Sequence, residues 1–164
     1  MTTMSSGSNT VSAPRLRTGS AIMALGGLGF VAYGVILFVR SFTDSFLELG
    51  IGHEQVDVTK TEIERFSPDL EHYITHLHIA ISGFVAAAGI AVAAIAWYGV
   101  RRGEWWAWVS AVVVPVVALA VALPAHYPWG FATIGHLGLI YADTLLFVVG
   151  AIIAFLALRE RDAR

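Results

Sequence analysis

The sequence predicts an all-α, polytopic membrane protein built as a bundle of four transmembrane helices, with one outer polar loop that contains a short amphipathic helix. Of the 164 residues, 57% are hydrophobic and 13% are charged, and the mean hydropathy is +0.71. A soluble domain has about twice that share of charge, roughly 25%. The apolar residues also fall in blocks that reach the about 20 residues needed to span a bilayer. One domain embedded in a lipid bilayer is therefore expected.

The first helix is predicted over about residues 19–42, after an N-terminal tail. Residues 1–17 are rich in Ser, Thr, Gly and Asn and show no apolar period, so they are expected to form a disordered cytoplasmic tail. Arg15 and Arg17 precede the apolar run as in a signal peptide. The run is too long for a signal peptide, however, and no small-residue cleavage site follows it. We therefore interpret it as an uncleaved helix whose glycines allow close packing.

The second helix is predicted over about residues 68–100, after the outer loop of residues 43–67. Within this loop, residues 59–66 have the pattern of a short amphipathic helix at the membrane surface. Ser67 suits the N-cap of the second helix and Pro68 suits its first position. At 1.5 Å per residue the helix is about 50 Å long, whereas the hydrocarbon core is about 30 Å thick. Its first turns are therefore expected to stand among the headgroups.

The third and fourth helices are predicted over about residues 104–123 and 133–158, and residues 159–164 form a second cytoplasmic tail. Pro115 lies near the middle of the third helix, where it removes a backbone hydrogen bond and is expected to cause a kink. The third helix begins with an aromatic belt typical of a membrane interface, formed by Trp105, Trp106 and Trp108.

The basic residues predict the orientation of the bundle. Seven of them fall on the side of the two termini: Arg15, Arg17, Arg101, Arg102, Arg159, Arg161 and Arg164. The other side has only Arg40, Lys60 and Arg65, among eight acidic residues in the polar segment 43–74. Since cytoplasmic loops are enriched in Lys and Arg, both termini are expected in the cytoplasm, with the protein in the plasma membrane.

Several classes of function are disfavoured by what the sequence lacks. There is no cysteine, which excludes disulfides, thiolate metal sites, Fe–S clusters and covalent c-type haem attachment. No P-loop, dinucleotide fingerprint, zincin motif or nucleophile elbow is present. A nucleic-acid partner is not expected, because no basic face is formed.

All six histidines are predicted on the outer side, and helical phase places two of them on polar stripes. His53 and His126 are expected in solvent-facing loops. One stripe on the second helix contains Glu71, His78 and Ser82, since these residues repeat near 100° per residue. Further stripes contain His136 with Asp143 on the fourth helix, and Tyr33 with Arg40 on the first. Polar stripes in membrane helices face the bundle interior, so Arg40, Glu71, His78 and His136 are expected near the surface, and Tyr33, Ser82 and Asp143 deeper.

Asp143 is the most informative single residue. A carboxylate at this depth costs roughly 2.5–3.5 kcal/mol on insertion scales. It therefore needs a partner, water or a proton. Two explanations stay open: a hydrogen bond that packs the helices, or a role as a proton relay, ligand anchor or metal ligand, together with Tyr33, Ser82 or Arg40.

The histidines suggest a transition metal or haem b as the cofactor. His72 and His76 share a helix face at a spacing compatible with metal binding, whereas His78 points elsewhere. A site would need His72 with His76, or His78 with His136, together with a carboxylate such as Glu71 or Asp143. His78 and His136 lie at similar depth, as the two axial ligands of a haem would. Ordinary headgroup-level histidines are the alternative interpretation.

Three hypotheses for the function follow. The first is a bundle with an outward-facing histidine and carboxylate pocket that binds a metal ion, haem or small ligand. The second is a non-catalytic structural or accessory subunit, in which polar stripes only pack the helices and the acidic segment 43–74 docks a membrane-protein partner. The third is a lipid- or quinone-handling enzyme with Asp143 and a histidine as acid and base. A transport path would require a homo-oligomer.

Overall fold

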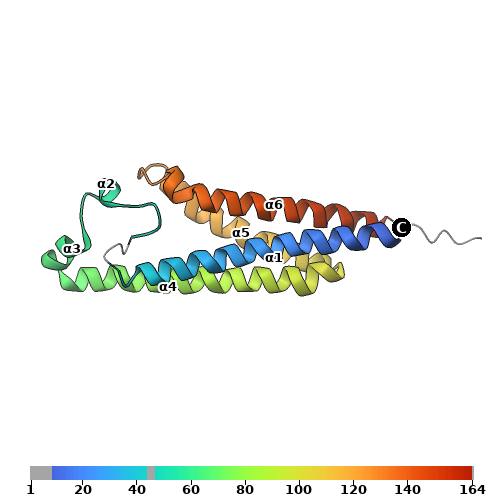
Figure 1. Cartoon of the computed structure of the whole chain (residues 1–164), viewed down its shortest axis with the longest axis horizontal. Helices are drawn as coiled ribbons and strands as arrows, with labels where there is room; N and C mark the ends of the chain where they lie inside the picture. Colours follow the sequence, from blue (N-terminus) through green and yellow to red (C-terminus); the bar gives the residue numbers. More distant parts are fainter. Residues whose placement is uncertain (1–8, 44–46, 164) are drawn as a thin grey trace, which may run out of the picture.

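The computed structural model describes residues 9–43 and 47–163, which form a bundle of four long helices with two short helices at one end (Figure 1). The long helices are α1 (Asn9–Arg40), α4 (Pro68–Ala94), α5 (Trp105–His126) and α6 (Ile134–Asp162). α4 continues through a π-helical turn, η1 (Ile95–Gly99), and a 3-10 turn, η2 (Val100–Arg102). All four are long and apolar enough to cross a membrane. The predicted all-α, four-helix, multi-pass membrane fold is confirmed.

One short helix and the N-cap of α4 form where the sequence indicates them. α3 (Lys60–Phe66) lies within the predicted amphipathic segment, whereas α2 (His53–Val56), in the same loop between α1 and α4, was not predicted. The Ser67 hydroxyl accepts a hydrogen bond from the Leu70 amide at 3.3 Å, so Ser67 is the N-cap of α4 as predicted. The structure therefore confirms that the polar loop ends at Ser67.

Three helices are longer than predicted, and one of them is α6, which continues to Asp162 instead of ending near residue 158. α1 begins at Asn9 rather than near residue 19, and residues 1–8 of the predicted tail lie outside the described residues. α5 continues through Pro124 to His126 instead of ending near residue 123. A proline in the last turn leaves only one carbonyl without its amide donor, so it does not end the helix there. This extension places His126 in the last turn of α5.

The backbone of α1 packs closely against α4 through glycines. A Cβ atom on Gly27 would lie 2.7 Å from the Ala93 nitrogen, and one on Gly89 would lie 2.6 Å from the Gly27 oxygen. No side chain fits in that space. Small residues that allow such close approach are the usual interface of membrane helices, where dispersion contacts replace the hydrophobic effect.

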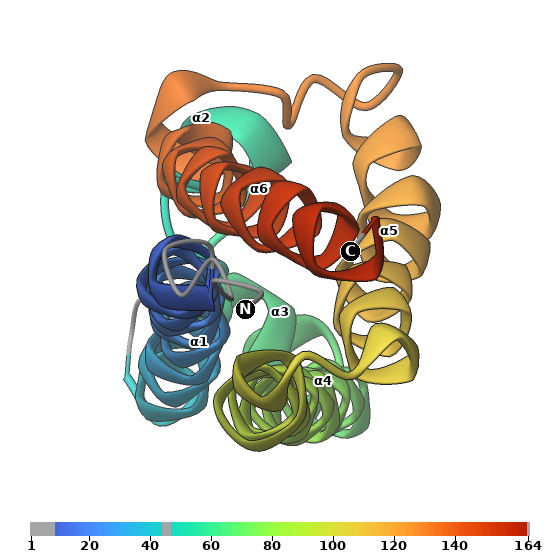
Figure 2. The same ribbon diagram turned by 90° about the vertical axis from the view of Figure 1, so that its right-hand side faces the viewer.

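α1 makes a second crossing of the same kind with α6. A Cβ atom on Gly19 would lie 2.6 Å from the Ala154 nitrogen, and one on Gly150 would lie 2.8 Å from the Met23 nitrogen. Viewed along the bundle, α1 lies beside both α4 and α6, while α5 stands on the far side (Figure 2). α1 is therefore the helix against which α4 and α6 are assembled.

The hydrophobic core is concentrated at the end of the bundle that bears both termini, which we call the terminal end. It includes Leu16, Met23, Ala96, Val100, Ala107, Ala111, Phe147, Ala154 and Leu158. The Trp108 indole donates to the Ala151 carbonyl at 2.9 Å, and the Trp105 indole donates to Asp162. These contacts fix α5 to α6 at the terminal end. We call the opposite end, with α2, α3 and the 127–133 turn, the loop end.

At the loop end, a buried ion pair attaches α3 to α4. Glu71 is 6% exposed and lies 3.5 Å from the Lys60 ammonium, and the Thr75 hydroxyl donates to its carboxylate at 2.7 Å. On α3 itself, hydrogen bonds from Thr59 hold the pKa of Glu62 below its usual range. The partners of Glu71 are therefore local residues that join two helices.

The glycine crossing predicts a difference between two Gly→Ala variants. Gly27→Ala forces a methyl group against the α4 backbone and is expected to lower the stability by about 1–3 kcal/mol, as overpacking does. Gly83→Ala is the matched control, because nothing lies within 4 Å of the added Cβ and alanine favours the helix. Thermal unfolding in detergent measures both. An unchanged melting temperature for Gly27→Ala would contradict the close crossing.

Candidate metal centre

Three side chains at the loop end present ligand atoms to one point. Glu48, His126 and His136 each offer one oxygen or nitrogen, and these atoms lie within 4.8 Å of one another. They come from three segments: the loop after α1, the end of α5 and the start of α6. Among the described residues, no other three histidine or carboxylate side chains bring their ligand atoms together in this way.

His136 is held by its surroundings in one orientation. It lies in the first turn of α6, where the Thr133 hydroxyl accepts a hydrogen bond from its amide at 3.2 Å, and it is 1% exposed. Its Nδ1 lies 2.7 Å from the Leu49 carbonyl oxygen. A carbonyl only accepts, so we assign the proton to Nδ1, which leaves the lone pair of a neutral imidazole on Nε2.

The Nε2 atom of His136 faces the carboxylate of Glu48. The distance to Glu48 Oε2 is 3.2 Å, yet among the described residues Nε2 makes no hydrogen bond of acceptable geometry. With Nδ1 protonated, a lone pair and a carboxylate oxygen face each other at close range. This contact is relieved either by a proton on Nε2, which makes His136 and Glu48 an ion pair, or by a metal ion bound to both atoms.

His126 repeats the arrangement. Its Nδ1 lies 2.8 Å from the Ala122 carbonyl oxygen, one turn earlier on α5, so its Nε2 also has the lone pair. The His126 and His136 rings stack with centroids 5.0 Å apart and planes at 25°. The prediction that His126 lies in a solvent-facing loop is wrong. It lies in the last turn of α5, because the helix passes through Pro124.

Backbone contacts fix the loop that supplies Glu48. The Arg40 guanidinium Nε donates to the Leu47 carbonyl at 3.0 Å. Gly50 has φ +77°, and a Cβ atom there would lie 2.2 Å from the Gly135 oxygen. Only glycine therefore fits both the left-handed conformation and the contact with α6. These two anchors place the Leu49 carbonyl on His136 and the Glu48 carboxylate beside it.

The arrangement of donors matches that of a metal centre. Metal-binding histidines usually donate their second ring nitrogen to a carbonyl or carboxylate, which fixes the tautomer. Two imidazole nitrogens and one carboxylate also form the ligand set of zinc sites that keep an open fourth position. Since His126 and His136 stack on each other, these two rings do not lie on opposite faces of a porphyrin.

The centre lies at the loop end of an internal cavity of about 540 Å³. The cavity lies among all four long helices, and its wall includes Tyr33 and Asp143 as well as the three ligand residues. A Cβ atom on Gly29 would lie 2.2 Å from Asp143 Oδ1, so Gly29 provides the space for this carboxylate. Among the described residues, no hydrogen bond or ion pair of Asp143 is formed.

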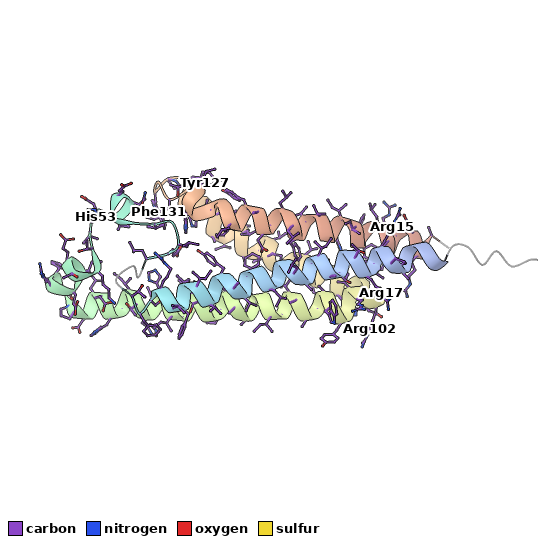
Figure 3. The ribbon with its side chains drawn as sticks, in the orientation of Figure 1. Arg15, Arg17, His53, Arg102, Tyr127 and Phe131 are labelled. Carbon is purple, nitrogen blue, oxygen red and sulfur yellow. The ribbon has the colours of Figure 1, made fainter. Side chains whose placement is uncertain are left out.

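A second hollow, of about 260 Å³, opens at the loop end and shares Glu48 and His126 with the cavity. His78, Trp129 and Phe131 line it. Figure 3 shows Phe131 and Tyr127 at the loop end, opposite Arg15, Arg17 and Arg102 at the terminal end. Glu48 and His126 therefore lie between this hollow, which we call the vestibule, and the cavity within the bundle.

The predicted site residues are divided among several places. His136, Tyr33 and Asp143 line the cavity, His78 lines the vestibule, and Arg40 holds the Glu48 loop.

The other predicted site residues lie elsewhere. Ser82 donates to the Ile79 carbonyl at 2.7 Å, and Glu71 pairs with Lys60. His72 and His76 are exposed. Of the predicted metal ligands, only His136 belongs to the three-residue group.

Comparison with known proteins gives no further guide to the site. No protein-family model, curated protein or solved structure matches the chain. The function is therefore inferred from the geometry of the site.

Sequence reasoning missed Glu48 and His126. Glu48 is one of eight acidic residues in the polar segment, and nothing in the local pattern distinguishes it. A signal was available in Gly50, which lies between apolar residues in the loop and marks a left-handed position. His126 could have been found if the third helix had been continued through Pro124.

The loop geometry predicts that Gly50→Ala detaches the Leu49 carbonyl from His136. The variant places a side chain in the left-handed region, at a cost of about 1–2 kcal/mol, and against the α6 backbone. In histidine-selective nitrogen NMR, the hydrogen-bonded Nδ1–H resonance of His136 should be lost. Gly52→Ala is the control, since its added Cβ meets nothing closer than 3.7 Å. An unchanged resonance in Gly50→Ala would refute the assigned hydrogen bond.

Proposed function

We propose that this protein is a multi-pass membrane protein that binds one divalent transition-metal ion through Glu48, His126 and His136. The observation on which the proposal rests is the commitment of both Nδ1 atoms to backbone carbonyls. It leaves two Nε2 lone pairs and one carboxylate around a single point. A metal ion with these three ligands keeps at least one open position, which faces the cavity.

The ligand types favour zinc, iron(II) or a neighbouring first-row metal over magnesium or calcium. Imidazole suits zinc, copper, iron and nickel, whereas carboxylate and carbonyl sets suit magnesium and calcium. Two histidines and one carboxylate form catalytic zinc sites and also the facial triad of non-haem iron(II) oxygenases. The thiolate ligands that soft metals prefer are excluded, because the chain has no cysteine.

The orientation that goes with this function has the loop end outside the cell and both termini in the cytoplasm of the plasma membrane. The clustering of arginines at the terminal end supports it through the positive-inside rule. In that orientation the vestibule opens to the outer aqueous phase. Metal ions would then enter the site from outside, past Trp129 and Phe131.

The alternative, a bundle whose polar groups only pack the helices, is supported for Glu71 and Ser82, which have local partners. It does not account for the metal-ligand group. A protonated His136 would pair with Glu48 and pack the loop against α6. With both imidazoles neutral, however, Glu48, His126 and His136 present only acceptors to one another. We therefore assign the packing role to Glu71 and Ser82. The binding role is assigned to Glu48, His126 and His136.

The test is metal binding by the purified full chain in mild detergent. Zinc, iron(II), cobalt(II) and copper(II) are titrated after removal of metal, and elemental analysis reports what the protein retains from the cell. Glu48→Gln, His126→Gln and His136→Gln should each weaken binding at least as much as loss of a supporting residue does, about 10–100-fold.

His76→Gln is the matched control, because His76 is exposed on α4 and outside the group. It should bind like the wild type. Equal losses in His76→Gln and His136→Gln, with the folds intact, would point to binding by surface histidines. No binding of any of the four metals by the wild type would overturn the proposal.

A further inference from the structure

The cavity behind the metal centre has the size and lining of a ligand site. Its volume of about 540 Å³ lies within the roughly 300–1,000 Å³ of small-molecule pockets. Most of the wall is apolar, with Phe30, Ile36, Leu119, Leu139 and Leu146 among the lining residues. Such a wall suits a hydrocarbon or ring system rather than a sugar, nucleotide or free ion.

The polar groups of the cavity are arranged along its length. Glu48, His126 and His136 lie where α6 begins, and Asp143 lies seven residues further along α6. At 1.5 Å per residue this separation is about 10 Å along the helix axis. Tyr33 and Asp143 are thus deeper in the bundle than the ligand group. A molecule that fills the space would be elongated, with its head at the loop end.

The charge of the loaded centre selects the head. A divalent ion bound by one carboxylate and two neutral imidazoles has a net charge of about +1 before a further ligand binds. A cation that is partly shielded from water attracts an anionic oxygen donor to its open position. Glu48 supplies only one negative charge, so the centre is complementary to a carboxylate or a related oxygen acid.

We place the entry of the chain on the α5–α6 side of the bundle. A third hollow, of about 340 Å³, lies between α5 and α6 and shares Leu119 with the cavity. Its lining, from Trp108 and Pro115 to Phe155, is almost entirely apolar. α5 is held to α6 by tryptophans at the terminal end, and this seam faces the lipid. An apolar chain can therefore enter from the bilayer while its head stays near the interface.

We propose, on the basis of the metal centre proposed above, that the cavity binds a single-chain amphiphile with an anionic oxygen head, the head on the metal ion and the chain between α1, α5 and α6 toward Asp143. The ligand class is thus fatty-acid-like. The protein joins a metal ion reached from the aqueous side to an acyl chain reached from the membrane side.

The experiment uses the full chain loaded with cobalt(II), whose visible spectrum reports changes in coordination. Acetohydroxamate and octanohydroxamate are the probes, because they share one anionic oxygen head and differ only in chain length. Each buried methylene contributes a few-fold in affinity, so octanohydroxamate should bind at least about tenfold more tightly. Both probes should change the cobalt spectrum in the same way.

Two variants distinguish binding of the probe in the cavity from its uptake by detergent micelles. Ala118→Phe fills the cavity from α5, eight residues before His126 and thus about 12 Å from the metal along the helix. It should abolish the chain-length advantage and leave cobalt and acetohydroxamate binding unchanged. Ala120→Phe is the control, because residue 120 is on the same helix and lines none of the cavities described here. Micelles take up octanohydroxamate equally in both samples.

The outcomes distinguish the two proposals. If the wild type binds neither cobalt(II) nor any of the other three metals, the metal centre itself is refuted. If cobalt binds but the two hydroxamates have equal affinity, the amphiphile is refuted and the metal centre stands. A chain-length advantage that survives Ala118→Phe would also refute the amphiphile, because the chain would then bind outside the cavity.

Discussion

The backbone contact of α1 with two other helices is the constraint on which the rest of the bundle depends. Inside a bilayer, helix association is not driven by the transfer of apolar surface out of water, so it rests on close packing. Gly19 and Gly27 allow this closeness on two faces of α1, toward α6 and α4. With both faces occupied, α1 has no comparable face for α5. The space between α5 and the other helices is what becomes the cavity.

The metal centre forms because the loop after α1 is held against two helices at Leu47, Leu49 and Gly50. Arg40 holds the Leu47 carbonyl, Leu49 accepts from His136, and Gly50 rests on Gly135. The first two contacts each give a backbone carbonyl a hydrogen-bond partner, and a buried carbonyl left without one costs about 1–3 kcal/mol. The loop conformation thus follows from ordinary backbone requirements. The approach of Glu48 to His136 is a consequence of this loop conformation. It leaves ligand atoms available to a metal ion.

The sequence predicts the fold well because hydropathy, helix caps and charge asymmetry all act locally. Ser67 and Pro68 mark the start of α4 without any tertiary information. Helical phase also places His136 and Asp143 on the face of α6 that lines the cavity, and Tyr33 on the matching face of α1. Helical phase does not apply to a loop, however, so the position of Glu48 could not be predicted from it. Polarity likewise does not separate Ser82, which bonds to its own helix, from residues that line a site.

A cavity of this size calls for an occupant, since atoms that line a void lose the dispersion contacts that packing would supply. The terminal end shows that this chain can pack tightly, because Ala96, Ala107 and Ala154 are fully buried there. The 540 Å³ cavity lies in the half of the bundle where the three ligand atoms meet. An acyl chain would restore the lost contacts along the apolar wall, and its head would complete the coordination of the ion. One elongated molecule thus accounts for both the space between α5 and the other helices and the open coordination position of the proposed metal ion.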